Sequence, residues 1–378
     1  MTELGTASMV PMEPAIVRPT TTAEVAEVLR TATASVRVMG NGRWLMGGGP
    51  FAAAAPLSVR AVAGVSAFSP GDLVLTAGAG TTLRELATVA GAEGQMLAVA
   101  PYGDDDATIG SVVATGGPAP LAFGDYTIRD LVLGLTVVTG TGDIIRVGGR
   151  VVKNVAGFDL VRLHTGAWGT LGIITEVTVR LHAIPAIDTI RCGVVDVPLA
   201  TLVPRLLEQR APLPMQLAWT GDTGPVLWAR CSGNAARATA LQAHVAAMGL
   251  RDMAAPADLS ALRATPSEAD VVRVQAARSD AIAVLDTVQV LLRAHAPTAT
   301  MVWDPLRGST RVVAPSLAAV MDELPARARN AGARQALLVI WEQGRRTVRP
   351  LSTVEARLKA AFDPRGLLNP QATPETFP

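Results

Sequence analysis

Glycines near the N-terminus follow a predicted strand in a pattern that suits anion binding. The segment 35–39 alternates as a strand, and the residues after it are Gly40, Asn41, Gly42, Arg43 and Trp44. Glycine permits positive φ and carries no Cβ, so backbone N–H groups can converge there on a group such as a diphosphate. A flexible hairpin turn explains this stretch equally well. It is neither a Rossmann fingerprint, since position 45 is Leu and no helical pattern follows, nor a Walker A loop, since Gly-Lys-Ser/Thr is absent.

Two further stretches are built from small residues. The small residues of the first lie at positions 107, 110, 111, 114, 116 and 117. Their size predicts that something bulky lies against this backbone. The run Asp104 to Asp106 just before them lacks the spacing and the final glutamate of a calcium loop, so we expect an exposed loop. In the second stretch, glycines at 166, 169 and 172 precede a predicted strand, where exposed main-chain groups would face a ring system edge-on.

The elements that must position these stretches divide the chain into two domains and a tail. The first half is rich in glycine and short β-branched runs, and the second half is richer in alanine and helical patterning. Glycine density falls near Ile184, so we predict domains at 1–185 and 186–349 and a C-terminal segment at 350–378. Expected strands in the first domain lie at 73–77, 131–138, 144–147 and 172–181, with helices starting near Thr20 and Thr82.

The second domain alternates strands with helices. Expected strands lie near 188–195, 216–219 and 226–229, and expected helices lie at 199–208, 235–248 and 280–294. A C-terminal helix at 353–362 ends in an Asp-Pro-Arg-Gly turn. The predicted fold class is α+β.

Composition excludes several functional classes. The net charge is +1, so nothing global directs the chain toward nucleic acid or anionic lipid. Cys192 and Cys231 lie far apart without ligand spacing, which predicts reduced, buried thiols. The four histidines form no metal-binding pattern, so no metal site is predicted. Apolar runs are too short to span a bilayer and the N-terminus lacks signal-peptide features, so we expect a cytoplasmic protein.

Taken in order, the motifs resemble those of FAD-linked oxidases, whose PCMH-type FAD-binding domain is shared by vanillyl-alcohol oxidase and the D-lactate and glycolate dehydrogenases. The resemblance runs from Val17-Arg18-Pro19 through the Gly40 loop, residues 107–110 and 130–135, residues 153–175, and the C-terminal segment 362–370. It covers about half of the chain. The short length and the Lys-Asn-Val-Ala-Gly-Phe-Asp motif at 153–159 are most similar to the small FAD-binding subunit of glycolate oxidases.

This resemblance implies a two-subdomain FAD-binding domain, a smaller α+β cap domain, and a C-terminal segment that returns to the FAD domain. It implies non-covalent FAD, because no attachment histidine of the covalent flavoenzymes is evident. By motif, the implied cofactor-binding residues are Gly40, Asn41, Gly42, Arg43, Trp44, Pro101, Thr108, Gly110, Ser111, Ala114, Gly117, Gly169, Gly172, Ile173, Ile174 and Asn369. The implied partners are a second FAD-containing catalytic subunit and an iron–sulfur subunit, through which any membrane contact would be peripheral.

The chain departs from the family pattern at three places. Arg43-Trp44 stands where the family has Ser or Thr, Ala167-Trp168 interrupts the usual Gly-Ser-Glu-Gly motif, and Gln371-Ala372 replaces Gly-Lys. Arg43 would contact the diphosphate or point to solvent. Either role agrees with the sequence.

Catalysis by this chain alone is the open question. Oxidising a 2-hydroxy acid requires a cation for the carboxylate and a base for the hydroxyl proton. The family's dehydrogenases resemble one another in a C-terminal histidine-rich cluster, whereas the region 188–349 holds His244 and His295 alone, which we expect on a helix surface and at a helix end. We therefore predict a supporting or electron-relaying subunit of a glycolate oxidase, with the catalytic residues unknown.

Two alternatives remain at this stage. A stand-alone dehydrogenase for D-lactate or glycolate would use Arg307 or Arg311 for the carboxylate, although the segment 303–311 also reads as a hairpin with exposed arginines. A structural subunit that has lost FAD would have Arg43 and Trp44 filling the diphosphate site.

Overall fold

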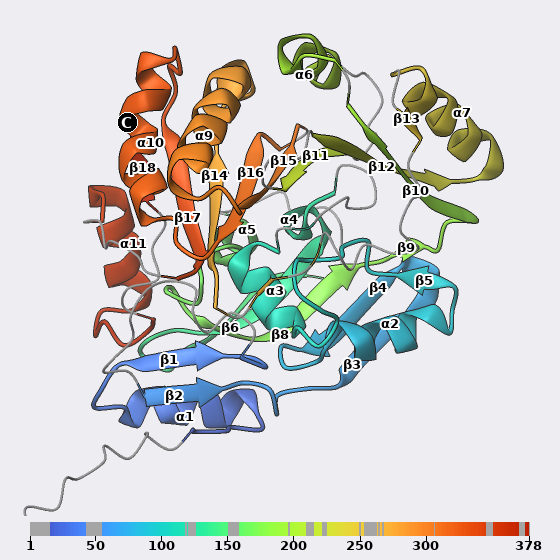
Figure 1. Cartoon of the computed structure of the whole chain (residues 1–378). Helices are drawn as coiled ribbons and strands as arrows, with labels where there is room; N and C mark the ends of the chain where they lie inside the picture. The colour runs from blue at the N-terminus through green and yellow to red at the C-terminus, as the bar shows by residue number, and fades with distance from the viewer. Residues whose placement is uncertain are drawn as a thin grey trace, which may run out of the picture.

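The structure of the chain is a computed structural model in which helices and strands are interspersed, and the predicted α+β class is confirmed. The described residues are 16–42, 55–117, 119, 126–149, 159–195, 197–208, 215–220, 225–248, 251–252, 263, 265–266, 268–305, 307–344, 351–369 and 375–377. Figure 1 shows three layers: a small strand pair with one helix at the bottom, a sheet in the middle, and a larger sheet topped by helices.

The lowest layer consists of α1 (Thr22–Thr31), β1 (Val36–Met39) and β2 (Ala55–Ser58). α1 begins where the Thr21 side chain accepts a hydrogen bond from the Glu24 N–H, and it buries one apolar face. β1 and β2 pair in parallel. On the other side of β1, Val36 forms a parallel bridge with Leu368, so segments from both ends of the chain build this layer.

The described strands of the middle layer form a five-stranded antiparallel sheet in the order β3-β4-β8-β6-β7. These strands are β3 (Val65–Ser69), β4 (Val74–Gly78), β6 (Val132–Val138), β7 (Ile144–Gly148) and β8 (Ile173–Arg180). The elements around them are η1 (Pro70–Asp72), α2 (Leu83–Gly91), β5 (Gln95–Met96), α3 (Ile109–Thr115), α4 (Ile128–Leu131), α5 (Leu160–His164) and β9 (His182–Ala183). Ile173 packs in the core shared with α1 and Ile174 in the core around α2 and α3, so β8 lies between two cores.

Two short helices differ from the sequence-based expectation. α3 lies within the small-residue stretch, for which no helix was predicted. α4 occupies the residues just before β6, where the predicted strand already began, and the Asp130 carboxylate holds its start by accepting the Thr127 N–H at 2.8 Å. Helices of one or two turns show too few residues for a helical period to stand out, so caps decide their position.

Within the described part of the chain, the top layer is a nine-stranded sheet, the cap sheet, in the order β13-β10-β12-β11-β15-β16-β14-β17-β18. Its strands are β10 (Ile187–Val194), β11 (Met215–Thr220), β12 (Val226–Gly233), β13 (Arg251–Asp252), β14 (Asp270–Gln275), β15 (Thr300–Asp304), β16 (Ser309–Ala314), β17 (Leu337–Gln343) and β18 (Glu375–Phe377). Its helices are α6 (Leu199–Leu207), α7 (Ala235–Ala246), η2 (Arg278–Asp280), α9 (Ala281–His295) and α10 (Ala318–Asn330). The α-helices cover one face of the sheet and form an apolar core with it (Figure 1).

The strand period of two leaves a polar face on the cap sheet, opposite these helices. On β14, Val272 and Val274 enter the helix-covered core, so Arg273 lies on the other face. On β17, Trp341 enters the same core, and Glu342 lies opposite. The polar face is directed toward the middle layer, and it bounds the cavity described below.

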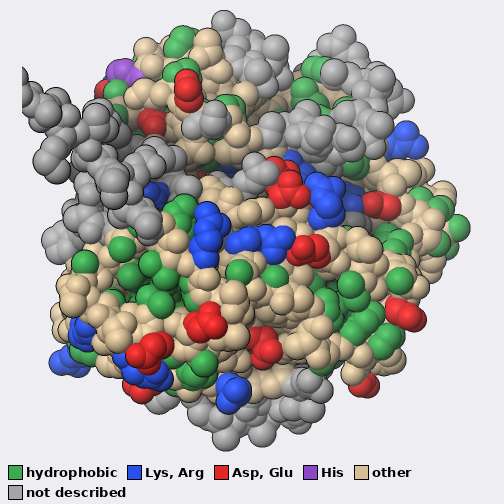
Figure 2. Space-filling view, turned by 90° about the horizontal axis from the view of Figure 1, so that it is seen from below, with side chains coloured by type: hydrophobic (Ala, Val, Ile, Leu, Met, Phe, Trp, Pro, Cys, Tyr) green, Lys and Arg blue, Asp and Glu red, His purple; other side chains and the backbone are tan. Residues whose placement is uncertain are grey.

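The chain returns to the lowest layer after the cap sheet through α11 (Thr353–Phe362), which the Ser352 side chain caps. Figure 2 views the molecule from below, and basic side chains gather near the middle of that face with acidic side chains beside them. No helix in the described ranges combines the length and the apolar character needed to cross a membrane.

Candidate functional site

The Gly40 loop lies against the start of α3. A Cβ built on Gly40 would lie 2.1 Å from the Thr108 hydroxyl oxygen, so a side chain there would force Thr108 to move. Asn41 Nδ2 donates to the Asp106 carbonyl at 3.0 Å. Within the described residues, no acceptor receives the main-chain N–H groups of Gly40, Asn41 or Gly42. Free N–H groups at the end of a strand fit the phosphate oxygens of a dinucleotide.

α3 continues the same surface. Thr108 is its N-cap and accepts the Ser111 N–H at 3.4 Å, while the Ser111 hydroxyl donates back to the Thr108 carbonyl at 2.7 Å. Ser111 and Ala114 are half-buried and lie three residues apart, so they share one face of the helix. Gly110 points elsewhere: its N–H donates to the Ala79 carbonyl at 2.9 Å, and a Cβ on it would lie 2.6 Å from the Ala79 Cβ. At position 110 the bulky neighbour is therefore the protein itself.

The turn 165–172 packs beside the end of α3. The Trp168 N–H donates to the Ala114 carbonyl at 2.8 Å, and the Gly166 N–H donates to the Val113 carbonyl at 2.9 Å. Trp168 adopts φ +54°, a conformation uncommon for a bulky residue. Such strain persists where the surrounding structure holds it, often at functional sites.

In residues 172–174, at the end of this turn, the backbone rather than the side chains is available to a ligand. Gly172 lies against β6, since a Cβ on it would be 2.3 Å from the Val137 side chain. Ile173 and Ile174 are 1% and 6% exposed, so both side chains are committed to the cores. The ladder between β4 and β8 ends at Glu176, which leaves the β4-facing edge of β8 outside that ladder at 173–174. A flavin would meet main-chain groups there.

Asn369 lies next to the turn and next to β1. Its Nδ2 donates to the Trp168 carbonyl at 2.7 Å, and its Oδ1 accepts the Val38 N–H at 2.9 Å. Gly169 is close by, since a Cβ on it would lie 2.9 Å from the Asn369 Nδ2. The C-terminal segment thus reaches the two segments, Gly40 loop and Gly169 turn, that the sequence assigned to FAD.

The structure therefore brings half of the predicted cofactor residues into one continuous frame, the cofactor frame. Its members are Gly40, Asn41, Gly42, Thr108, Ser111, Ala114, Gly169 and Asn369. Gly117 follows the end of α3, and Pro101 lies at the edge facing the cap, where its carbonyl accepts from Arg263 Nε at 2.9 Å. Arg43 and Trp44 lie outside the described residues. The contact of each residue with FAD stays a prediction.

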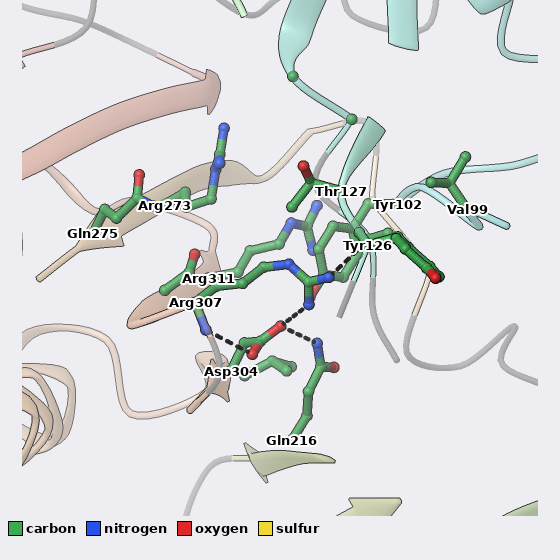
Figure 3. A pocket seen from close by; sticks show the side chains of 15 residues that line it. Val99, Tyr102, Tyr126, Thr127, Gln216, Arg273, Gln275, Asp304, Arg307 and Arg311 are labelled. Atoms are coloured by element: carbon green, nitrogen blue, oxygen red, sulfur yellow. Dashed lines mark hydrogen bonds and ion pairs between the residues drawn. The ribbon is translucent and has the colours of Figure 1, made fainter. Parts of the chain in front are cut away.

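A cavity of ≈ 220 Å³ lies between the middle layer, near the end of α3, and the polar face of the cap sheet (Figure 3). The first and middle parts of the chain line it with Val99, Tyr102, Gly116, Gly117, Tyr126 and Thr127. The cap sheet lines it with Gln216, Arg273, Gln275, Asp304, Arg307 and Arg311. Of these residues, sequence reasoning had named Gly117, Arg307 and Arg311 as candidate binding residues, and it missed the others.

Glu342 joins two of the cavity arginines. Its carboxylate accepts from Arg273 Nε at 3.1 Å and from Arg311 Nε at 2.9 Å, and the residue is 2% exposed. Arg311 Nη2 also donates to the Thr265 hydroxyl at 2.8 Å. Its guanidinium carbon lies 3.9 Å from the centre of the Tyr102 ring. Burial raises the pKa of Tyr102 above its ordinary value, so the phenol stays neutral.

Asp304 organises the other end of the cavity. It accepts from Arg307 Nη1 at 2.6 Å, and Gln216 Nε2 lies 3.5 Å from the same carboxylate (Figure 3). Arg307 Nη2 donates to the Tyr126 carbonyl at 2.8 Å, which ties the cap to the middle layer. Gln216 is 2% exposed, and its Oε1 has no partner among the described residues. A buried acceptor of this kind suits a hydroxyl group of a ligand.

The predicted hairpin at 303–311 is confirmed, but the prediction that its arginines are exposed is wrong. β15 and β16 do form the hairpin, but Arg311 is 4% exposed and Arg307 is mostly covered. The reason is the strand period, which places Arg311 on the polar face beneath Tyr102.

The histidines are not part of the cavity wall, although the His182 ring packs against Tyr126, which lines the cavity, with 4.5 Å between the ring centroids. All four belong to the described part of the chain, and none lines the cavity. His244 is exposed on α7, and His295 at the end of α9 pairs with Glu323 at 2.9 Å, which confirms both predicted positions. Burial lowers the pKa of His164 to about 4, and burial together with nearby Arg180 lowers that of His182.

The cysteines are buried and free, as predicted, and burial raises the pKa of both Cys192 and Cys231. Among the described residues, no group of three or more His, Cys, Asp or Glu side chains is placed to hold a metal ion.

Comparison with known families identifies the domain that this frame belongs to. The family described as "FAD binding domain" matches residues 14–148. The chain therefore carries an FAD-binding domain, and FAD is its cofactor. The fold is similar to that of alkyldihydroxyacetonephosphate synthase, with a TM-score of 0.68 at 14% identity over 94% of this chain and 75% of that one.

Several curated proteins are similar to parts of the chain. Glycolate oxidase subunit GlcE of Escherichia coli is 42% identical over 127 residues, which are 33% of this chain and 36% of that protein. D-lactate dehydrogenase of Archaeoglobus fulgidus is 36% identical over 173 residues, 44% of this chain and 38% of that protein. Glycolate oxidase subunit GlcD of Bacillus subtilis is 43% identical over 105 residues, 25% of this chain and 22% of that protein. The chain thus spans less than two-fifths of the length of each.

A sequence signal for the missed cavity residues does exist. Arg273 interrupts a run of valines in 270–275, and Glu342 follows an apolar run in 337–343. A charged residue at alternate positions of an otherwise apolar strand indicates a face that is buried yet polar. That pattern does not predict which strands are neighbours in the sheet.

Proposed function

We propose that this chain is the FAD-binding subunit of a heteromeric glycolate oxidase, and that it supports or relays electron transfer rather than oxidising glycolate itself. Bound FAD would supply the acceptor for the substrate hydride. The cofactor frame would hold FAD through main-chain N–H groups near Gly40 and through the Thr108 and Ser111 end of α3.

The observation that carries this proposal is the state of the carboxylates at the cavity. Arg307 engages Asp304, and Arg273 and Arg311 engage Glu342. These contacts occupy both carboxylates, and none of the four histidines lines the cavity. The cavity can therefore receive a small anion, while the base that 2-hydroxy-acid oxidation requires would come from another subunit.

The proposed partners are a second FAD-containing catalytic subunit and an iron–sulfur subunit, with electrons passing on to an acceptor such as quinone. Similarity to both GlcE and GlcD, two named glycolate oxidase subunits, supports a place in such an assembly. The proposed location is the cytoplasm, with any membrane contact made through these partners.

The test is glycolate-dependent dye reduction by the purified chain, measured alone and after mixing with the two partner subunits. We expect a yellow protein with little turnover alone and restored turnover in the mixture. Robust turnover by the chain alone would contradict the supporting role.

A stand-alone 2-hydroxy-acid dehydrogenase is the second candidate, and Arg273 is the observation that favours it. The two arginines first considered for the carboxylate, Arg307 and Arg311, already bind protein groups through their terminal nitrogens. Arg273 uses only Nε in its contact with Glu342, and within the described residues its terminal nitrogens have no partner. Arg273 would thus take the carboxylate, and Gln216 Oε1 would accept the hydroxyl.

Anaerobic bleaching of the flavin by glycolate or D-lactate distinguishes this candidate. Bleaching by the chain alone that is lost in Arg273→Met would support it, and exposed Arg293→Met on α9 is the matched control. No bleaching in the wild-type chain would leave the subunit proposal as the better account.

A further inference from the structure

We propose that the C-terminal segment 359–369 is a clasp that sets the Gly40 loop and the Gly169 turn relative to each other, with Asn369 as a positioning residue rather than a direct ligand of FAD. This inference rests on FAD binding by the domain and goes beyond the proposed role in glycolate oxidation. It concerns how a cofactor site made of distant segments is assembled.

Asn369 bridges the two segments through one side-chain amide. Its Oδ1 accepts the N–H of Val38, two residues before Gly40, at 2.9 Å. Its Nδ2 donates to the carbonyl of Trp168, the neighbour of Gly169, at 2.7 Å. The residue is 7% exposed. Because both amide ends are engaged by backbone, the side chain is committed to joining these segments.

The backbone at this junction is strained on both sides. Trp168 has φ +54° and Asn369 has φ +35°, and neither is glycine. Positive φ costs free energy in residues with a Cβ, so it persists only where contacts over-determine it. The hydrogen bond between Asn369 and Trp168 joins these two strained residues directly. Its loss would let the turn relax.

Lys359, one of two lysines in the chain, fastens the same turn from α11. Its Nζ donates to the Thr170 carbonyl at 2.7 Å, to the Leu368 carbonyl at 2.8 Å and to the Asp363 carboxylate at 2.6 Å. Asp363 is 2% exposed and also accepts the N–H groups of Leu367 and Leu368. One ammonium group therefore links the turn to the strand-like end of the clasp.

Arg365 provides a matched control within the clasp. It donates to the carbonyls of Leu29, Arg30 and Ala32 at the end of α1. It therefore anchors the same segment with a similar number of bonds to backbone, but it contacts neither the Gly40 loop nor the Gly169 turn. Loss of Arg365 would weaken the attachment of the clasp without disturbing the junction.

The experiment compares Asn369→Ala, Lys359→Met and Arg365→Met in the full chain. Three quantities are measured: the Kd for FAD from flavin fluorescence, the visible circular dichroism of bound flavin, and the Tm of the apoprotein. Asn369→Ala loses two side-chain hydrogen bonds and Lys359→Met loses three, so we expect both variants to weaken FAD binding by about tenfold or more and to change the dichroism. We expect Arg365→Met to lower the Tm while leaving the Kd within about twofold.

The proposal is overturned if Arg365→Met weakens FAD binding as much as Asn369→Ala, since clasp stability alone would then account for the effect. It is also overturned if Asn369→Ala and Lys359→Met leave the Kd and the dichroism unchanged. If Asn369→Ala does not fold, Lys359→Met decides, because Asn369 is retained there. A wild-type chain that binds no FAD would refute the clasp as well, whereas absence of a role in glycolate oxidation would leave it intact.

Discussion

The cofactor frame and the cavity differ in the groups that form them. The frame consists of small residues and main-chain groups that approach one another closely, as where Gly40 meets the Thr108 side chain. On the cap side, charged and polar side chains of one sheet face line the cavity, and buried ion pairs hold them, as at Glu342. We therefore expect added side-chain volume to destabilise the frame, and removal of a charged group to destabilise the cavity.

The largest expected effect comes from removing the charge that two cavity arginines share. Glu342→Gln leaves Arg273 and Arg311 without their common partner, and breaking a buried ion pair in this way costs about 3–5 kcal/mol. Urea unfolding measures the loss in free energy of unfolding. The control is Glu27→Gln, which breaks an exposed pair with Arg30 and should change little. If both substitutions have equally small effects on the free energy of unfolding, buried charge does not stabilise the cavity in the way proposed.

The next effect comes from adding one methyl group at Gly110 of α3, where the helix that carries part of the frame packs on Ala79. In Gly110→Ala the new Cβ would lie 2.6 Å from the Ala79 Cβ, and overpacking of this kind costs about 1–3 kcal/mol. Gly91→Ala in α2 is the matched control, because a Cβ there meets nothing within 4 Å. Urea unfolding should show loss of stability for the first variant and none for the second. A neutral Gly110→Ala would mean that the frame tolerates added volume.

The third effect is the pH dependence that buried His164 gives to the stability of the folded chain. Burial lowers its pKa in the folded chain to about 4, below the ordinary 6.5. Between these values the unfolded chain binds the proton and the folded chain does not, so stability falls by about 1.4 kcal/mol per pH unit as the pH decreases from 6.5 toward 4. Urea unfolding at several pH values should show this slope, and His164→Gln should reduce it, leaving the smaller part that His182, whose pKa is also lowered, contributes. The exposed His244→Gln serves as control and should keep it.

The smallest effect is expected where the two regions meet. Arg263 Nη2 pairs with Asp105 at 2.7 Å across the junction, but the Asp105 side chain is 50% exposed. Asp105→Asn should therefore cost no more than about 1 kcal/mol, and the cost should shrink further at high salt. Urea unfolding at two salt concentrations checks this. A loss several times larger would mean that the junction is held by charge as strongly as the cavity.

The same contrast explains what the sequence could predict. The frame could be predicted from the sequence, because glycines at fixed offsets after strands carry a local signal. In addition, the order of the Gly40, Thr108 and Asn369 motifs resembled that of a known family. The FAD domain and the α+β fold class followed from these patterns. The helix α3 did not, because its seven residues owe their position to the Thr108 cap more than to periodicity.

The cavity could not be predicted from the sequence, because its residues come together only through the pairing of distant strands. Arg273, Arg311 and Glu342 each stand on a separate strand, and they become neighbours only through the strand order β16-β14-β17. That order is non-local and leaves no mark in any single segment. The sequence accordingly suggested Arg307 and Arg311 for an anion, whereas the partners of those two residues point to Arg273 instead.

The bond between Asn369 and Val38 joins residues 331 positions apart, which has a consequence for the timing of synthesis. At about 5–20 residues per second, a ribosome needs roughly 15 to 65 seconds to pass from one to the other. During that interval β1 lacks the neighbour that Leu368 later provides, and an unpaired strand edge is a site of mispairing. We expect nascent chains stalled before residue 367 to retain no flavin. Flavin loading would then report that residue 369 has been synthesised.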